Sequence, residues 1–191
     1  MTLNTADLTG PRTDRGHNMT TASGLPFWPA DPRPEDIRIE DIAAHLSRLC
    51  RFNGALRDDW DIYSVAQHSV LVSANVPPEY RLEGLLHDAA EAYLGDRVKP
   101  LKMLMPEYDE FEFKVDIAIR CKFGLPLTKS DVVREADYRA VLTERRDVLP
   151  TNLSVDWGTP KAEPWADVII PWSVLSARAS FMWAFRRLYR G

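Results

Sequence analysis

The sequence predicts an all-α fold, arranged as one helical domain. Apolar residues recur at three- and four-residue spacing through most of the chain, which is the pattern of amphipathic helices. Prolines, glycines and hydroxyl residues stand where such helices would begin and end, and no stretch alternates convincingly as a strand does. With 191 residues, 45% of them hydrophobic, the chain is long enough for the core of a single domain.

The first half of the chain is expected to hold three helices. Isoleucines and leucines at helical spacing predict a helix near residues 36–50. The capping box Ser64-x-x-Gln67 predicts the start of a second helix that runs to about Ala74. Two prolines end that helix, and a third is expected over residues 79–94, closed by a glycine.

The second half continues in helices that proline and glycine delimit. The expected elements are a short helical turn at 100–104 and helices over 106–123, from just after Thr128 to about 148, and over 171–189. Gly124 would close the first long helix, and Thr128-x-x-Asp131 resembles the cap of the next.

Two segments lack helical periodicity. Residues 1–24 are polar and predict a disordered tail, which leaves residues 25–191 as the folded domain. Residues 149–170 are rich in proline and contain Trp157 and Trp165. Loops of that length are uncommon, so this segment could be a lid over a site, or it could only pack against the domain.

Charge and composition exclude several classes of function. The formal net charge of −4 lacks the basic surface of a protein that binds nucleic-acid polymers through their phosphates. No stretch approaches the roughly 20 apolar residues that a membrane helix needs. Two cysteines cannot form a disulfide framework, and reduced thiols in the cytoplasm are the simpler interpretation. A glycine-rich loop of the GxxxxGK[ST] kind is missing, which argues against an ATPase.

Four polar side chains stand where the helical pattern calls for apolar ones: His68, His87, Asp88 and Asp137. A carboxylate on the buried face of a helix is costly unless it is paired or binds a metal. Two imidazoles and two carboxylates suit Mn, Fe, Co, Ni or Zn, and the sequence does not choose among them. A single such histidine is more often a hydrogen-bonded core residue, and Asp137 could instead cap a helix or pair with an arginine.

The short sequence motifs around these residues resemble those of the HD-domain phosphohydrolase superfamily. They are Tyr-Ser-Val-Ala-Gln-His-Ser at 63–69, Leu-His-Asp-Ala-Ala-Glu-Ala-Tyr-Leu-Gly-Asp at 86–96, Pro-Leu-Lys at 100–102 and Glu-Ala-Asp at 135–137. The order H…HD…D is complete, and the extension HD-x-x-E-x-x-x-G-D is similar to the bacterial 5′-deoxynucleotidase branch, which phages also carry. The similarity covers about residues 25–147.

The resemblance implies one divalent transition metal, bound by His68, His87, Asp88 and Asp137, and hydrolysis of a nucleotide phosphate ester. It also implies a catalytic set in which Glu91 handles the proton, with Asp88 and Arg51 beside it. Glu91 lies one helical turn after His87, so both would face one cleft. The alternative is that Glu91 only orients His87 by a hydrogen bond.

Substrate contacts are implied at two places. Arg51 would clamp a phosphate and Phe52 would wall the base, although a solvated arginine near a helix end is the alternative. Asp96 would accept a hydrogen bond from the sugar 3′ hydroxyl, or it is an ordinary turn residue. The next three residues, Arg97-Val98-Lys99, depart from the family's apolar–Pro–small pattern and put the base and the number of phosphates in doubt.

The favoured function is therefore hydrolysis of (deoxy)nucleoside 5′-monophosphates. The alternatives are a deoxynucleoside triphosphate triphosphohydrolase acting on substrates such as dATP and, in a different class, a non-catalytic helical protein that binds a nucleotide. Hydrolysis of a cyclic or signalling nucleotide ranks lower. The final helix has an apolar face at Phe181, Met182, Trp183 and Phe185, which could complete the core or form the interface of a homodimer or higher homo-oligomer.

Overall fold

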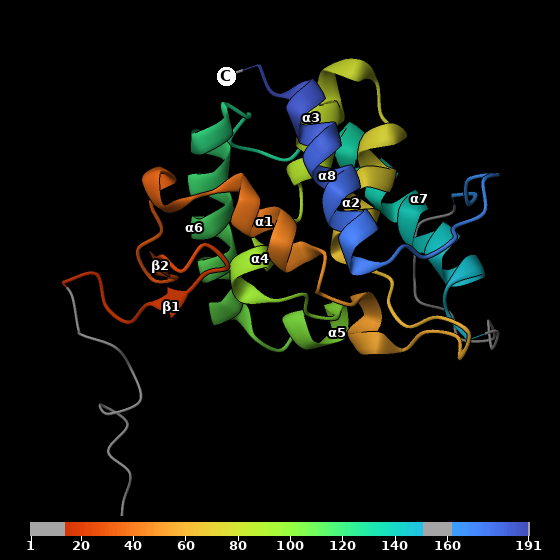
Figure 1. The fold of residues 1–191 in the computed structure, drawn as a ribbon, viewed down its shortest axis with the longest axis horizontal. Helices are drawn as coiled ribbons and strands as arrows, with labels where there is room; N and C mark the ends of the chain where they lie inside the picture. The colour runs from red at the N-terminus through yellow and green to blue at the C-terminus, as the bar shows by residue number, and fades with distance from the viewer. Residues whose placement is uncertain (1–13, 151–161, 191) are drawn as a thin grey trace, which may run out of the picture.

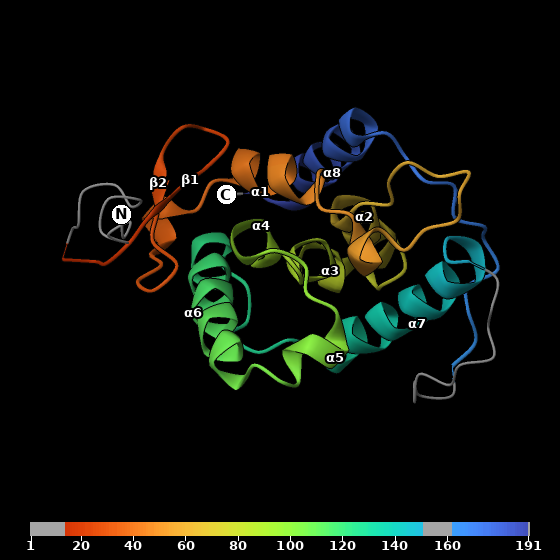
Figure 2. The same cartoon turned by 90° about the horizontal axis from the view of Figure 1, so that it is seen from below.

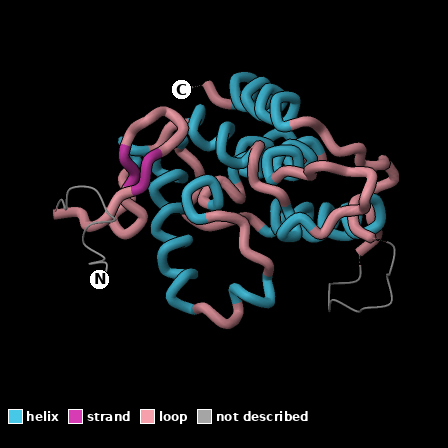
Figure 3. Tube along the Cα trace, turned by 60° about the horizontal axis from the view of Figure 1, so that its bottom comes forward, coloured by secondary structure: helices cyan, strands magenta, loops and turns pink. Residues whose placement is uncertain are grey.

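The fold is all-α, as the sequence predicts, apart from one two-stranded ribbon (Figure 1; Figure 3 shows the short strands). The structure is a computed structural model and describes residues 14–150 and 162–190. The α-helices are α1 (Ile39–Leu46), α2 (Val65–Ala74), α3 (Arg81–Leu86), α4 (Glu91–Leu94), α5 (Lys99–Lys102), α6 (Pro106–Phe123), α7 (Asp131–Asp147) and α8 (Val174–Leu188). The strands are β1 (Met19–Thr20) and β2 (Pro26–Phe27), paired antiparallel. Within the described ranges, no helix is both long and apolar enough to span a membrane.

Helix α2 is the centre of the domain. It packs against α1, α3, α7 and α8, and Figure 2 shows it enclosed by them. Its residues Val65–Ser69 are all buried, which fits a helix with small and apolar side chains on every side. Ser64 caps its start by accepting a hydrogen bond from the backbone N–H of Gln67. His68 therefore projects from a central helix that is packed on several sides.

The predicted helix over 79–94 is wrong in one respect, because it is broken at residues 87–90. Helix α3 ends at Leu86 and α4 begins at Glu91, and the residues between them form tight turns. The backbone N–H of Ala89 donates to the carbonyl of Leu86, and that of Glu91 donates to Asp88. These three-residue hydrogen bonds tighten the chain relative to an α-helix. Gly95 ends α4 with a positive φ of 86°, as the sequence predicts.

Gly84 lets α3 lie very close to α2. A Cβ atom at this position would stand 3.2 Å from the Cα of Ser73 on α2, so a larger residue would push the helices apart. The hydroxyl of Ser73 also donates to the carbonyl of Arg81 at 2.8 Å. The close approach brings the end of α3 beside the middle of α2.

Helix α6 matches its predicted bounds, and Gly124 ends it in the left-handed conformation. Helix α7 begins one turn after the predicted cap residue, because Ser130 rather than Thr128 accepts the hydrogen bond from the N–H of Val133. Both are hydroxyl residues near the helix start, so spacing alone could not separate them.

The predicted disordered tail is wrong for residues 14–24, because they lie on the domain. Arg15 pairs with Asp31 and Asp36 and stacks over Trp28 at 4.1 Å. Met19 packs against the main core, and the hairpin is bound to α1 where Asp41 accepts from the N–H of Ser23 at 2.6 Å. Arg15, one of the polar residues that suggested disorder, thus pairs with partners farther along the chain. Residues 1–13 lie outside the described part.

The segment before α8 lies against α7, at least over residues 162–170 (Figure 1). Trp165 is buried, and its backbone N–H donates to the hydroxyl of Thr143 at 3.0 Å. The N–H of Ile169 donates to Asp147 at 2.9 Å. This part of the predicted lid is thus packed on the domain, and Trp157 lies outside the described residues.

Helix α8 completes the core, which is one of its two expected roles. It begins at Val174 behind the cap Ser173, three residues later than predicted. Phe181 and Phe185 are buried in the main core, whereas Trp183 is 63% exposed. The homo-oligomer stays a prediction, which light scattering on the purified protein tests.

Candidate metal centre

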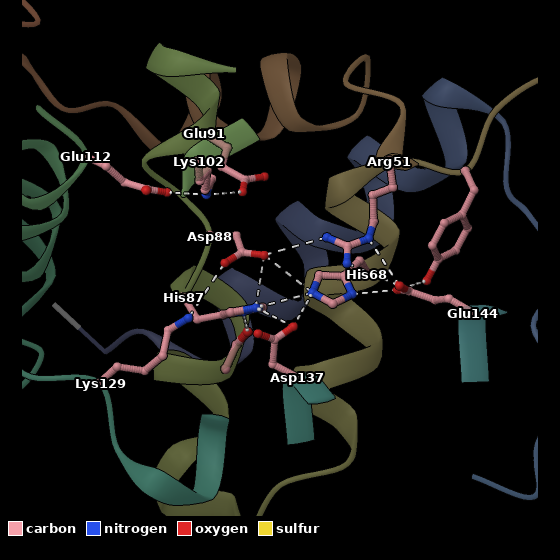
Figure 4. A network of polar contacts seen from close by, with 12 residues as sticks. Arg51, His68, His87, Asp88, Glu91, Lys102, Glu112, Lys129, Asp137 and Glu144 are labelled. Atoms are coloured by element: carbon pink, nitrogen blue, oxygen red, sulfur yellow. Dashed lines mark hydrogen bonds and ion pairs between the residues drawn. The ribbon is translucent and has the colours of Figure 1, made fainter. Parts of the chain in front are cut away.

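The four predicted metal ligands converge on one point (Figure 4). His68 projects from α2, His87 and Asp88 from the turn after α3, and Asp137 from α7. One ligand atom from each lies within 4.8 Å of those of the other three. The Nε2 atom of His68 lies 3.3 Å from Nε2 of His87 and 3.2 Å from Oδ1 of Asp137. Two imidazole nitrogens and two carboxylate oxygens could therefore hold one metal ion.

The break after α3 explains how neighbouring residues reach the same point. Successive side chains on a regular α-helix diverge by about 100°, so two adjacent residues rarely face one target. The tight turns at 87–90 bring Oδ2 of Asp88 to 3.1 Å from Nε2 of His87. The local departure from helical geometry is thus part of the site.

Hydrogen bonds on the far side of each imidazole fix its orientation. Nδ1 of His87 lies 2.8 Å from the carbonyl of Gly84, an acceptor, so Nδ1 carries the proton. Nδ1 of His68 lies 2.6 Å from Oε1 of Glu144. In both residues the Nε2 atom is left to face the centre, which is how metal-binding histidines are usually held.

Glu144 is a site residue that sequence reasoning missed. It is fully buried on α7 and also accepts hydrogen bonds from Tyr63 at 2.9 Å and from Arg51 at 3.2 Å. It lies seven residues, two helical turns, after Asp137 and so faces the same side of α7. That seven-residue spacing from Asp137, on one predicted helix, was the available signal.

The electrostatics of the centre favour a bound cation. Burial alone would raise the pKa of Asp88, but the charge of His87 and hydrogen bonds from both histidines outweigh it and lower that pKa well below the usual range. At Asp137, burial alone would likewise raise the pKa, but hydrogen bonds from His68 and His87 outweigh burial and lower it. Both carboxylates therefore remain ionised at neutral pH.

The imidazoles respond to these charges in the opposite sense. Burial and the charge of Arg51 would lower the pKa of His68, but Glu144, Asp137 and Asp88 raise it well above its ordinary value. The pKa of His87 is raised as well, against its burial, and Asp88 is the largest raising influence. The centre thus attracts positive charge, which a proton or a metal ion can supply.

Glu91 lies beside the centre with an unsatisfied oxygen. The residue is 5% exposed, and its Oε2 atom has no hydrogen-bond partner within the described ranges. Burial, followed by the charges of Asp88 and Asp96, raises its pKa well above the ordinary value. Its Oε1 atom lies 3.6 Å from Lys102, and Figure 4 shows Oε2 pointing away from that lysine. The Nδ1 atom of His87 is hydrogen-bonded to the carbonyl of Gly84 and not to Glu91, so Glu91 does not orient this imidazole through Nδ1.

Arg51 is part of the centre and is not a solvated charge. It is 8% exposed, and its Nη1 atom lies 3.8 Å from Oδ2 of Asp88. The backbone N–H of Arg51 donates to the carbonyl of Tyr63 at 2.9 Å, which fixes this residue beside the start of α2. Phe52 follows with its ring 5.3 Å from the guanidinium of Arg51. Phe52 and Asn53 both have positive φ, 56° and 52°, an uncommon conformation for residues other than glycine.

The remaining predicted contacts lie around α5. Asp96 is half-buried. Burial raises its pKa, and the charge of Arg51 offsets only part of that rise. Lys99 is exposed and stands over the ring of Tyr138, next to Asp137, at 5.8 Å. Arg97 turns instead to α6, where it stacks on Tyr108 at 4.8 Å. Val98 occupies the N-cap position of α5 and makes no capping hydrogen bond through its side chain.

Two lysines near the centre were given no role by the sequence. Lys102 bridges Glu91 and Glu112, at 3.6 and 2.7 Å, and appears only as part of the Pro-Leu-Lys word. Lys129 precedes α7, and its Nζ atom lies 3.7 Å from Oδ1 of Asp88. No motif in the sequence marks Lys129, because it reaches Asp88 only through the packing of α7 beside α3.

Comparison with known proteins identifies relatives but no activity. No profile of a known protein family matches the chain. The uncharacterised protein YfdR of Escherichia coli is 48% identical over 128 residues, which cover 67% of this chain and 70% of YfdR. An uncharacterised protein of Rhodobacter capsulatus is 39% identical over 114 residues, covering 56% of this chain and 58% of that protein. Identity of this degree over more than two thirds of the E. coli protein shows that the chain belongs to the YfdR family.

Proposed function

We propose that this protein is an HD-domain phosphohydrolase that removes phosphate from deoxynucleoside 5′-monophosphates. The observation that carries the proposal is the convergence of His68, His87, Asp88 and Asp137 beside the buried, partly unsatisfied carboxyl of Glu91. The words H…HD…D and HD-x-x-E-x-x-x-G-D support the same assignment. A metal, a proton-handling group and a cation for phosphate are the parts that phosphate-ester hydrolysis needs.

The proposed metal is one divalent transition ion, taken from Co, Mn, Ni, Fe or Zn. The two imidazole Nε2 atoms suit these ions better than Mg²⁺ or Ca²⁺, which prefer oxygen ligands. When bound, such an ion lowers the pKa of a water molecule and neutralises phosphate charge. Asp88 and Asp137 would supply the matching negative charge, and Glu144 would hold the His68 ring in position.

Glu91 is proposed to move the proton. Burial and the charges of Asp88 and Asp96 raise its pKa and so favour the neutral acid, which could donate a proton to the 5′ oxygen as that oxygen leaves. The Oε2 atom lacks a partner among the described residues, so it can meet a ligand without breaking an existing hydrogen bond. Arg51, held by Glu144, would orient a phosphate oxygen next to Asp88.

A triphosphohydrolase is the second candidate, and the extra cations around α5 favour it. Lys99 and Lys102 stand on the α5 side of the centre, where further phosphates of a substrate such as dATP could extend. A protein that only binds nucleotides would share these contacts, because a metal set does not by itself prove turnover.

One screen separates the three functions. Purified protein, loaded with each metal in turn, is incubated with deoxynucleoside mono-, di- and triphosphates, and the products are identified. Inorganic phosphate from dAMP or another monophosphate is the expected result. Tripolyphosphate from dATP would replace the proposal with the second candidate. Saturable binding without turnover for every metal and nucleotide would indicate a protein that only binds nucleotides. Asp137→Ala protein serves as the control for contaminating phosphatases.

A further inference from the structure

Asp88 is held by positive charge from two sides (Figure 4). Its Oδ2 atom faces Arg51 at 3.8 Å and both histidines, whereas its Oδ1 atom faces Nζ of Lys129 at 3.7 Å. In Figure 4, Lys129 and Arg51 approach the carboxylate from opposite directions. The distance from Lys129 exceeds that of a direct hydrogen bond, so the ammonium group is near Asp88 without being bonded to it.

The position of Lys129 is built into the fold. Arg120, which is 1% exposed on α6, donates to the carbonyl of Pro126 at 2.6 Å. The buried carboxylate of Glu83 on α3 accepts from the N–H of Ser130 at 2.8 Å. Glu83 and Arg120 also pair with each other at 3.5 Å. The connection between α6 and α7 is therefore held at both sides of Lys129, so the lysine backbone has a defined place.

A lysine at this position weakens metal binding, whereas its charge would favour a ligand that is an anion. Like charges near each other repel, so a cation close to a metal-ligating carboxylate lowers the affinity of the site for a metal ion. The side chain of Lys129 is 26% exposed and that of Asp88 is 17% exposed, so both are partly accessible from solvent. A dianionic phosphate there would meet two complementary charges instead of one.

We propose that Lys129 is a second phosphate-binding residue, which holds the substrate phosphoryl group on the side of Asp88 opposite Arg51. This inference rests on the proposed function, because it assigns the substrate's phosphate to the metal centre. It adds a contact from the α6–α7 connection, outside every word of the sequence that suggested the activity. Lys129 binds the phosphate before and during reaction, so its loss raises KM more than it lowers kcat.

The first test measures binding of inorganic phosphate to Co²⁺-loaded protein by calorimetry. We expect Lys129→Gln to weaken phosphate binding about ten- to a hundredfold, the usual range for a charge-assisted hydrogen bond, and Lys129→Arg to restore most of it. Lys122→Gln is the matched control, because Lys122 is an exposed lysine of α6. Unchanged phosphate binding in Lys129→Gln overturns the inference.

The second test measures Co²⁺ affinity from the visible absorption of the bound ion. Lys129→Gln should bind Co²⁺ as tightly as the unaltered protein or more tightly, because a repelling charge is removed. Weaker Co²⁺ binding together with unchanged phosphate binding would mean that Lys129 only positions Asp88, and it would overturn the inference. Thermal unfolding of each variant shows that it is folded.

The two proposals fail in different ways. Protein that binds phosphate through Lys129 but hydrolyses no nucleotide would refute the proposed function and support the Lys129 contact. Protein that hydrolyses a nucleotide with the same KM in the Lys129→Gln variant would refute the contact and support the function.

Discussion

His68 and Glu144 are joined at 2.6 Å, and both side chains are wholly buried. The carboxylate that orients this imidazole lies on α7, the helix that also carries Asp137. One helix therefore supplies one candidate metal ligand directly and fixes a second one through a hydrogen bond. Any shift of α7 against α2 would disturb both ligands together.

Glu144→Gln should weaken metal binding about 10- to 100-fold, which is the usual loss when the group orienting a metal-bound histidine is changed. The glutamine has nearly the same size but loses the charge that attracts the His68 proton and Arg51. Metal affinity measured by titration checks this, with the exposed Glu135→Gln on the same helix as control. Equal affinities in the two variants would show that His68 needs no help from Glu144.

Asp137→Ala should reduce the bound metal well below one ion per chain, because a quarter of the protein ligand set is lost. Elemental analysis of protein purified in parallel gives the stoichiometry. Asp131→Ala is the control, because Asp131 is on the same helix with a side chain that is 96% exposed. Full metal content in Asp137→Ala would remove this residue from the centre.

Glu91→Gln should lower kcat by about 10²- to 10⁴-fold, the range for loss of a general acid or base, while metal content and thermal stability stay unchanged. The amide keeps the shape of the side chain but cannot release a proton. Steady-state kinetics measure the effect, and the exposed Glu79→Gln is the control. A Glu91→Gln protein that retained the full rate would exclude the proton-transfer role.

Metal affinity should fall as the pH falls through the neutral range. The pKa values of His68 and His87 are raised above about 6.5 in the metal-free protein, so a metal must displace a proton from each imidazole that is charged. Asp88 and Asp137 have lowered pKa values and stay ionised, so they add no dependence there. Each displaced proton contributes up to about tenfold in Kd per pH unit.

Co²⁺ titrations at about pH 6, 7 and 8 measure this dependence. In Glu144→Gln the pKa of His68 should be lower, because a raising charge is gone, and the fall in affinity should begin at a lower pH. A Kd that stays constant with pH in the unaltered protein would contradict the assigned protonation of the imidazoles.

Asn53→Ala should lower the free energy of unfolding by about 1 kcal/mol, because alanine tolerates a positive φ less well than asparagine does. Asn53→Gly should cause no such loss, since glycine adopts this conformation readily. Chemical denaturation of both variants measures the difference. If the two unfold at the same denaturant concentration, the backbone at Asn53 is not strained.

The helices and the cluster of candidate metal ligands were predictable because each follows from a local pattern. Helix α6 shows the clearest case, with Pro106 at its start and Gly124 after its end. His68 and Asp137 stood out because they interrupt apolar stripes. Such departures from a periodic pattern are visible without any knowledge of the tertiary structure.

The break at 87–90 was not predictable, because Leu-Leu-His-Asp-Ala-Ala-Glu-Ala-Tyr-Leu contains no residue that stops a helix. Tertiary packing on α2 overrides the local preference there. Arg15 was misassigned to a disordered tail for a similar reason, since its partners Asp31 and Asp36 lie 16 and 21 residues away. Lys129 depends on the same kind of distant packing.

Gln67 precedes the candidate ligand His68 in the sequence, and its side chain is hydrogen-bonded to the segment before α8. Its amide donates to the carbonyl of Ile170 at 2.9 Å and accepts from the N–H of Trp172 at 2.7 Å. A minimal fragment that kept only the motif-bearing residues would strip this clamp and the cover of α8 from α2. We expect such a fragment to bind metal more weakly even though every candidate ligand is present, because the helix that carries His68 would lose the segment packed against it.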